Sequence, residues 1–180
     1  MTATQAAAMP PTLDVRARVM LKEFVSYQAL YATVPGLAID QALNIPKEWG
    51  REGGGFARRA GSRYGRYVLG ETIEFAVSGL LNEDPRYIYS KRNGMWNRTK
   101  DAITGTFLVP KVDGNSRTLA IGRIAGVFGS RAIASRWEPD SQRTIGGILQ
   151  RGATGMATKT AVSIGREFWP DIRRKVFHKP

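Results

Sequence analysis

The stretch from residue 61 to residue 87 constrains the fold most strongly, because a helical apolar period ends there at a proline. Its apolar residues recur at spacings that fit one broad helical face, as shown by Tyr64, Val68, Phe75 and Leu81. Pro85 disfavours helical geometry at the preceding residue and cannot donate to the helical ladder. We therefore expect a long central helix that ends at a structural corner made of Asp84, Pro85, Arg86 and Tyr87.

Residues 116–137 and 141–168 repeat this design of a long helix followed by a stop at a proline. Glycine inside a helix costs about 1 kcal/mol relative to alanine, so glycines on one helical face indicate that another helix comes close. The predicted helix-packing face consists of Gly61, Gly65, Gly122, Gly126, Gly129, Gly147, Ala161 and Gly165. A second structural corner is predicted at Trp169, Pro170 and Asp171. The pattern predicts an all-α fold of closely packed Gly/Ala-faced helices.

The segments around these helices have weaker patterns. Residues 14–43 fit a helix that Pro35 kinks or splits, and the three glycines within residues 47–56 favour an irregular loop. Residues 107–121 fit a helix–loop–helix better than the alternative short hairpin, because Pro110 and a gap of five to six residues weaken the hairpin pattern.

The length of 180 residues indicates one helical domain over residues 13–172. Residues 1–12 are expected to be disordered, and residues 173–180 form a basic tail. The chain has no cysteine and a single histidine, so a thiolate metal site and a histidine metal pair are excluded. That histidine, His178, lies near the end of the chain and is expected to be exposed rather than catalytic, so no Ser/His/Asp arrangement is expected. We expect no enzyme activity, no catalytic residue, no metal and no cofactor. Glu71 and Glu74 are expected to be neutralised by nearby arginines such as Arg63 or Arg66, rather than to bind a metal or to act as acid and base.

The net charge of +12, from 27 basic and 15 acidic residues, favours an anionic partner. Basic residues alternate with aromatic ones in residues 87–99, a pattern found both at membrane interfaces and on surfaces that stack nucleic-acid bases. It also fits a solvated loop with its aromatics folded onto the core. The longest uncharged run, residues 24–39, is shorter than the roughly 20 apolar residues of a membrane span. The predicted anionic-surface contacts are Lys91, Arg92, Arg98, Arg173, Arg174 and Lys175.

Three short motifs occur in order along the chain: Trp49-Gly50 before a glycine-rich segment, Asp84-Pro85-Arg86-Tyr87, and Glu167-Phe168-Trp169-Pro170-Asp171. In order and spacing they resemble an uncharacterised family of small glycine-rich bacterial proteins whose members often look exported to the cell envelope. The resemblance implies no known activity and transfers no catalytic residue. Residues 1–11 lack a complete signal peptide, although Ala6-Ala7-Ala8 is similar to the end of one.

These observations predict a non-enzymatic, membrane-associated helical protein, as a structural or accessory subunit of a larger membrane or envelope complex. Its expected partners are an anionic lipid surface and other subunits of such a complex, with no small-molecule substrate. The alternative is a nucleic-acid-binding protein that uses the basic and aromatic surface. The expected location is the periplasm or outer envelope if a signal sequence precedes Met1, and the cytoplasmic face of a membrane otherwise.

Overall fold

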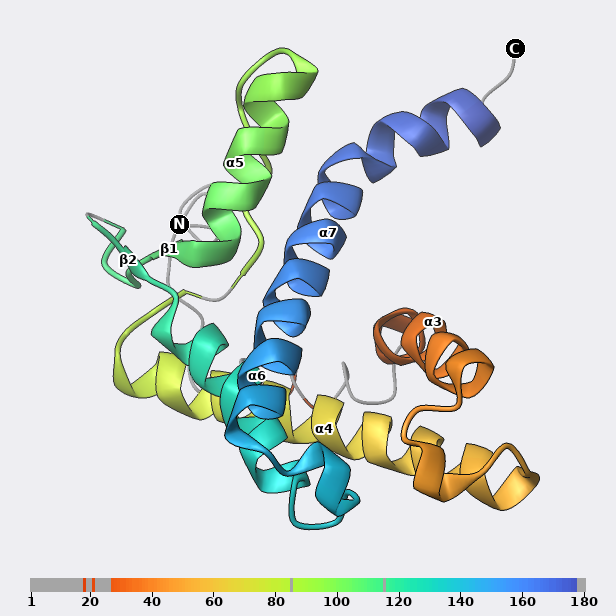
Figure 1. Cartoon of the computed structure of the whole chain (residues 1–180). Helices are drawn as coiled ribbons and strands as arrows, with labels where there is room; N and C mark the ends of the chain where they lie inside the picture. Colours follow the sequence, from red (N-terminus) through yellow and green to blue (C-terminus); the bar gives the residue numbers. More distant parts are fainter. Residues whose placement is uncertain (1–17, 19–20, 22–26, 85, 115, 178–180) are drawn as a thin grey trace.

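The computed structural model describes residues 18, 21, 27–84, 86–114 and 116–177 (Figure 1). Within these residues the α-helices are α3 (Tyr27–Leu43), α4 (Gly53–Leu80), α5 (Met95–Phe107), α6 (Ile121–Ala134) and α7 (Ile145–Phe177). Short 3-10 helices lie at η1 (Lys47–Trp49) and η2 (Asp140–Gln142). Strand β1 (Leu108–Pro110) pairs antiparallel with β2 (Arg117–Leu119). The predicted all-α fold is confirmed, and the hairpin forms instead of the favoured helix–loop–helix.

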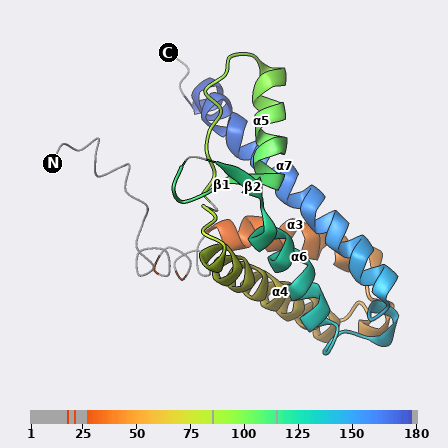
Figure 2. The ribbon, with the colours of Figure 1, turned by 90° about the vertical axis from the view of Figure 1, so that its left-hand side faces the viewer.

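Helices α4 and α6 pack side by side with their backbones in close approach (Figure 2). A Cβ added at Gly126 would lie 2.5 Å from the carbonyl oxygen of Gly70, and one added at Gly122 would collide with Ser78. At Gly129 it would lie 3.3 Å from the Cδ1 of Ile73. Only glycine allows this spacing at Gly122 and Gly126, so these two members of the predicted packing face do bring two helices together.

Most other residues of the predicted packing face do not contact a partner helix. Among the described residues, nothing lies within 4 Å of a Cβ built at Gly61 or Gly165, and Ala161 is exposed. Gly147 meets only its near neighbours in sequence, and Gly65 meets a side-chain atom of Trp137 at 3.8 Å. The stripe predicted on α7 was therefore wrong as a contact between helices. Helical periodicity identifies residues that share a face, but not the face that a partner helix covers.

A different face of α7 packs on α6. A Cβ at Gly152 would collide with the ring of Phe128, and one at Gly155 would collide with the guanidinium group of Arg131. Met156 follows on this face and is 6% exposed. Helix α7 therefore uses Gly152 and Gly155 for the close approach that was predicted for Gly147 and Gly165.

Both ends of α4 differ from the prediction. The glycines predicted as a loop form its first turn, where a Cβ at Gly55 would meet backbone carbonyls of η1 and its C-cap. At the other end Asn82 has a positive φ of 54°, and the backbone N–H of Glu83 donates to the carbonyl of Ser78 at 2.9 Å. This is a Schellman motif, which ends α4 at Leu80, before Pro85 is reached.

The prolines are weaker stops than predicted. Pro35 lies inside α3 and does not split it. Helix α7 continues through Pro170 to Phe177, so Trp169, Pro170 and Asp171 lie within a helix instead of ending one. Figure 1 shows α7 changing direction in its last third, as expected where a proline removes a backbone hydrogen bond. The first residues of the predicted basic tail therefore belong to α7.

The interior is polar and much of the surface is apolar. The buried hydrophobic residues are few and mostly small: Ala29, Ala102, Val109, Ala120, Val127, Ala134 and Met156. The largest fully buried side chains are Arg59, Glu83, Glu167 and Thr106. Large apolar side chains point outward, with Leu80 83% exposed, Ile145 78% and Met95 76%. This reverses the usual preference of soluble proteins. Among the described helices, none is long and apolar enough to cross a membrane.

Candidate functional site

A buried carboxylate joins the segment after α4 to the C-terminal part of α7. Glu167 is 1% exposed and accepts hydrogen bonds from the Tyr87 hydroxyl at 2.7 Å, the Ser90 backbone N–H at 3.1 Å and Arg98 Nε at 2.9 Å. Burial opposes ionisation, but the bonds from Arg98, Tyr87 and Ser90 outweigh it and hold the pKa of Glu167 below its ordinary value. Burial and the bond to Glu167 raise the pKa of Tyr87.

Arg98 was predicted to contact an anionic surface, and the structure gives it a different role. Its Nε binds Glu167, and its Nη1 lies 2.5 Å from a carboxylate oxygen of Asp171. Its guanidinium carbon also lies 4.7 Å from the centre of the Phe168 ring. Because two carboxylates already neutralise Arg98, it is a bridge between α5 and α7. Through it the structure brings together Tyr87 and Asp171, one residue from each predicted corner.

The other corner residues are placed separately. Arg86 Nη2 lies 2.6 Å from Asp84 Oδ2, as expected for a structural corner. Trp169 is 56% exposed and Pro170 faces an open depression. Pro85 lies outside the described residues.

An open depression of about 300 Å³ lies between the segment before α5 and the end of α7. Exposed basic and apolar side chains lie in its lining and in the adjoining first turns of α5. Arg92 is 65% exposed and only 3.6 Å from Asp101, a weak surface pair. Trp96 is 68% exposed and Lys100 lies 5.2 Å from its ring centre. The lining residues are Tyr89, Ser90, Lys91, Arg92, Asn93, Gly94, Arg98, Glu167, Pro170 and Asp171.

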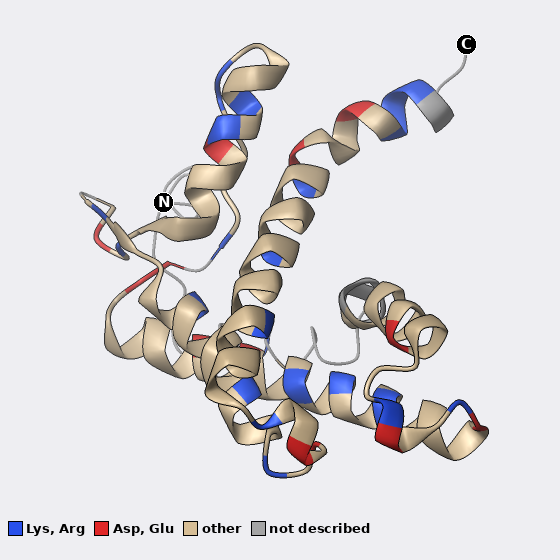
Figure 3. Ribbon diagram, in the orientation of Figure 1, with Lys and Arg blue, Asp and Glu red and all other residues tan. Residues whose placement is uncertain are grey.

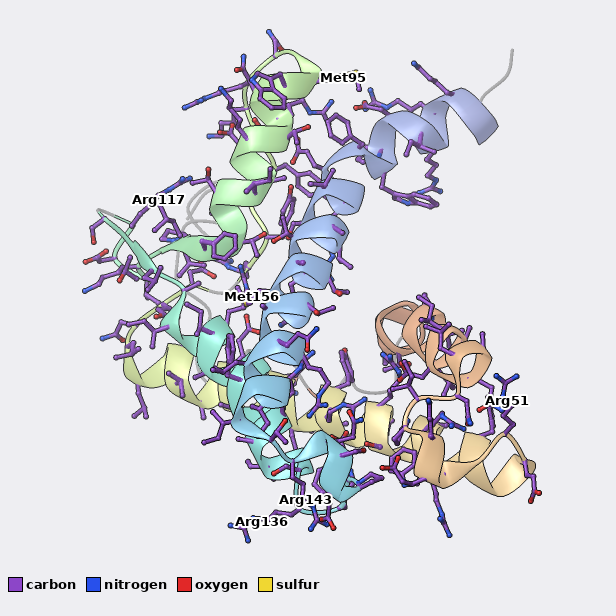
Figure 4. All side chains as sticks on the ribbon, viewed as in Figure 1. Arg51, Met95, Arg117, Arg136, Arg143 and Met156 are labelled. Atoms are coloured by element: carbon purple, nitrogen blue, oxygen red, sulfur yellow. The ribbon has the colours of Figure 1, made fainter. Side chains whose placement is uncertain are left out.

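The remaining predicted basic contacts lie at the same end of the molecule. Arg173, Arg174 and Lys175 are exposed in the last turns of α7, directly after Asp171. Figure 4 places Met95 at the projecting tip of α5, and Figure 1 shows this tip and the end of α7 extending from the rest of the molecule. We call the exposed residues Lys91, Arg92, Met95, Trp96, Lys100, Trp169, Arg173, Arg174 and Lys175 the basic–aromatic tip.

The acidic pair of α4 has partners other than those predicted. Lys159 of α7 bridges Glu71 at 3.1 Å and Glu74 at 2.5 Å, and Arg123 Nε of α6 lies 3.1 Å from Glu74. Burial raises the pKa of Glu74, but Lys159 and Arg123 outweigh it and keep that pKa low. The two acids are neutralised by basic residues, as expected, but the partners are Lys159 and Arg123 instead of Arg63 or Arg66. In the part of the chain that the structure describes, no group of acids and histidine can hold a metal ion.

Two buried residues were missed by the sequence analysis. Both oxygens of Glu83 accept backbone N–H groups of the first turn of α6, from Ile121 and Gly122 at 3.0 Å each. Arg59 donates to the carbonyls of Ile45, Pro46 and Gly50 and organises the turn between α3 and α4. Neither position carries a local signal. Glu83 caps a helix that begins 38 residues later in sequence, and the carbonyls that Arg59 binds lie 9 to 14 residues before it.

Comparison of this chain with protein-family models, with curated proteins and with solved structures finds no match.

Proposed function

We propose that this protein is a non-enzymatic helical protein that associates with a membrane, as a structural or accessory subunit of a larger membrane or envelope complex. The observation that carries this proposal is the reversed distribution of side chains. The largest fully buried side chains include two carboxylates and a guanidinium group, while Leu80, Met95, Trp96 and Ile145 are each more than two-thirds exposed. An apolar exterior is stable where it contacts lipid or another apolar subunit.

The basic–aromatic tip gives this association an orientation. Exposed tryptophans next to lysine and arginine suit the headgroup region of a bilayer, where an aromatic ring is partly apolar and partly wet. Each basic residue near an anionic leaflet contributes about 1 kcal/mol of attraction. Among the described residues, Lys91 and Arg92 have no close carboxylate partner beyond the weak contact of Arg92 with Asp101, so their charges are available to such a surface. The tip therefore contacts the anionic lipid, and the apolar helix faces contact lipid or a neighbouring subunit.

Flotation with liposomes tests the proposal. The full chain should float with vesicles that contain phosphatidylglycerol at low salt, and less with pure phosphatidylcholine. The double variant Lys91→Gln and Arg92→Gln should float less than the double variant Arg117→Gln and Arg136→Gln, which removes the same charge. Figure 4 shows Arg117 and Arg136 at margins of the molecule away from the tip. Failure to float at low salt, together with purification as a soluble monomer without detergent, would contradict the proposal.

Nucleic-acid binding is the second candidate, and the exposure of Tyr89 and Trp96 beside basic residues favours it. Tyr89 is 54% exposed, and Trp96 is more open still. Stacking of a base on an aromatic ring contributes about 1–3 kcal/mol. A filter-binding assay with single-stranded DNA distinguishes the two candidates. Binding that falls steeply with salt and requires Trp96 would support this function, and absence of binding at low salt would reject it.

A further inference from the structure

Arginines from α4 and α7 meet at one buried carboxylate, Glu138. Glu138 is 4% exposed and follows α6. One of its oxygens contacts Arg66 of α4 and accepts the Ser62 hydroxyl at 3.1 Å, and the other lies 4.0 Å from Arg151 of α7. Figure 3 shows basic positions on α4 and along α7. Glu138 therefore forms ion pairs with two guanidinium groups.

Arg131 of α6 belongs to the same group but has no carboxylate. Among the described residues its hydrogen bond goes to the Val127 carbonyl of its own helix, at 2.8 Å. Its guanidinium group lies against the backbone of α7 at Gly155, one turn beyond Arg151. A guanidinium group has five N–H donors, so most donors of Arg131 have no protein acceptor in this part of the chain.

The charge balance of this group is positive. Arg66 and Arg151 share the carboxylate of Glu138, and Arg131 has no carboxylate contact among the described residues. Three cations with one carboxylate leave an excess of two positive charges. Arg63 lies nearby but is paired with Asp40 at 2.7 Å. Burial, followed by the neighbouring Arg151 and Arg63, lowers the pKa of Arg131 to about 10. Burial disfavours the charged form, and the neighbouring arginines add repulsion to it.

We propose that Arg66, Arg131 and Arg151 form a binding site for a phosphate-type oxyanion. Phosphate carries about two negative charges at neutral pH and several strong acceptor oxygens, which matches the charge excess and the unused donors of Arg131. Arg151 also donates to the side chain and the carbonyl of Gln142, and Arg66 donates to the Ser62 hydroxyl. Arginine binds phosphate with paired N–H groups, a geometry that lysine does not offer. Arg66 is 22% exposed and Arg151 30%, so an anion from solvent can reach them. The site does not overlap the basic–aromatic tip.

The oxyanion has two chemical sources, an anionic phospholipid headgroup and free phosphate, and only the first rests on the proposed membrane association. Equilibrium dialysis with labelled inorganic phosphate measures the free anion. We expect Arg131→Gln to weaken binding at least about tenfold, as for the loss of one hydrogen bond to a charged group. Arg136→Gln removes the same charge from an exposed position and should bind phosphate like the unaltered protein. Far-UV circular dichroism checks that both variants are folded.

Flotation of the same variants on phosphatidylglycerol vesicles identifies the source. Loss of flotation in Arg131→Gln but not in Arg136→Gln supports the headgroup, whether or not free phosphate binds. Loss of phosphate binding with unchanged flotation supports free phosphate. Phosphate binding by a protein that does not float at all would remove the proposed membrane function and keep the site. The site is overturned if Arg131→Gln matches Arg136→Gln in both assays.

Discussion

Replacing Gly126 by alanine tests the close approach of α4 and α6. The added Cβ would lie 2.5 Å from the Gly70 carbonyl oxygen, 3.1 Å from Glu74 Cβ and 3.2 Å from Glu74 N, whereas ordinary contacts begin at 3.4 Å. Two of these atoms belong to the backbone of α4, so no rotamer change relieves the collision and the helices must separate. Overpacking of this kind costs about 1–3 kcal/mol, at the upper end when backbone must move.

Helix propensity acts in the opposite direction. Alanine in a helix interior is favoured over glycine by about 1 kcal/mol. The net effect expected for Gly126→Ala is a loss of about 1–2 kcal/mol in the free energy of unfolding. Gly165→Ala is the matched control, because among the described residues nothing lies within 4 Å of its added Cβ. It should gain up to about 1 kcal/mol from propensity alone.

Denaturant unfolding followed by far-UV circular dichroism measures both changes. For a chain of this size each kcal/mol also shifts Tm by roughly 2–4 °C, so the two variants should separate clearly in a thermal scan. The opposite signs are the essential result. If Gly126→Ala were as stable as Gly165→Ala, α4 and α6 would not be in backbone contact, and the packing described here would be refuted.

Other substitutions test the buried charges by denaturant unfolding. Arg98→Met leaves Glu167 buried without its cation and should cost about 3–5 kcal/mol, whereas Arg92→Met at the exposed surface should change stability by less than about 0.5 kcal/mol; equal losses would contradict the bridge. Glu83→Ala leaves two N–H groups of α6 without an acceptor and should cost about 1–3 kcal/mol, and an unchanged midpoint would contradict the cap. Because the pKa of Glu74 is lowered on folding from its ordinary value of 4.5, its stabilisation is present above that pH and is lost as the pH falls through the folded pKa. Unfolding at a series of acidic pH values should therefore show a decline that Glu74→Gln makes shallower.

The helices could be predicted from the sequence because their signals are local. Gly122 and Gly126 stand one turn apart in an apolar stretch, and that spacing alone indicates close packing. The ends of the helices were predicted less well. Pro85 is a stronger signal in the sequence than Asn82, yet the positive φ of Asn82 ends α4 first. Asparagine adopts a positive φ more readily than most residues, so Asn82 is itself a signal for the end of a helix, and the expectation placed on Pro85 overlooked it.

Several partners of the buried acids could not be predicted, because Glu74, Glu138 and Glu167 pair with bases from distant parts of the chain. The pair of Asp84 with Arg86 is local, and it could be predicted. Glu74 binds Arg123 and Lys159 across 49 and 85 residues, and Glu167 binds Arg98 across 69. Once these pairs form, the acids of the interior are neutralised by their own cations. The positive charge that remains is not spread evenly over the surface. Part of it is concentrated in the basic–aromatic tip and around Arg131, so these are the two places where an anionic partner would gain the most from binding.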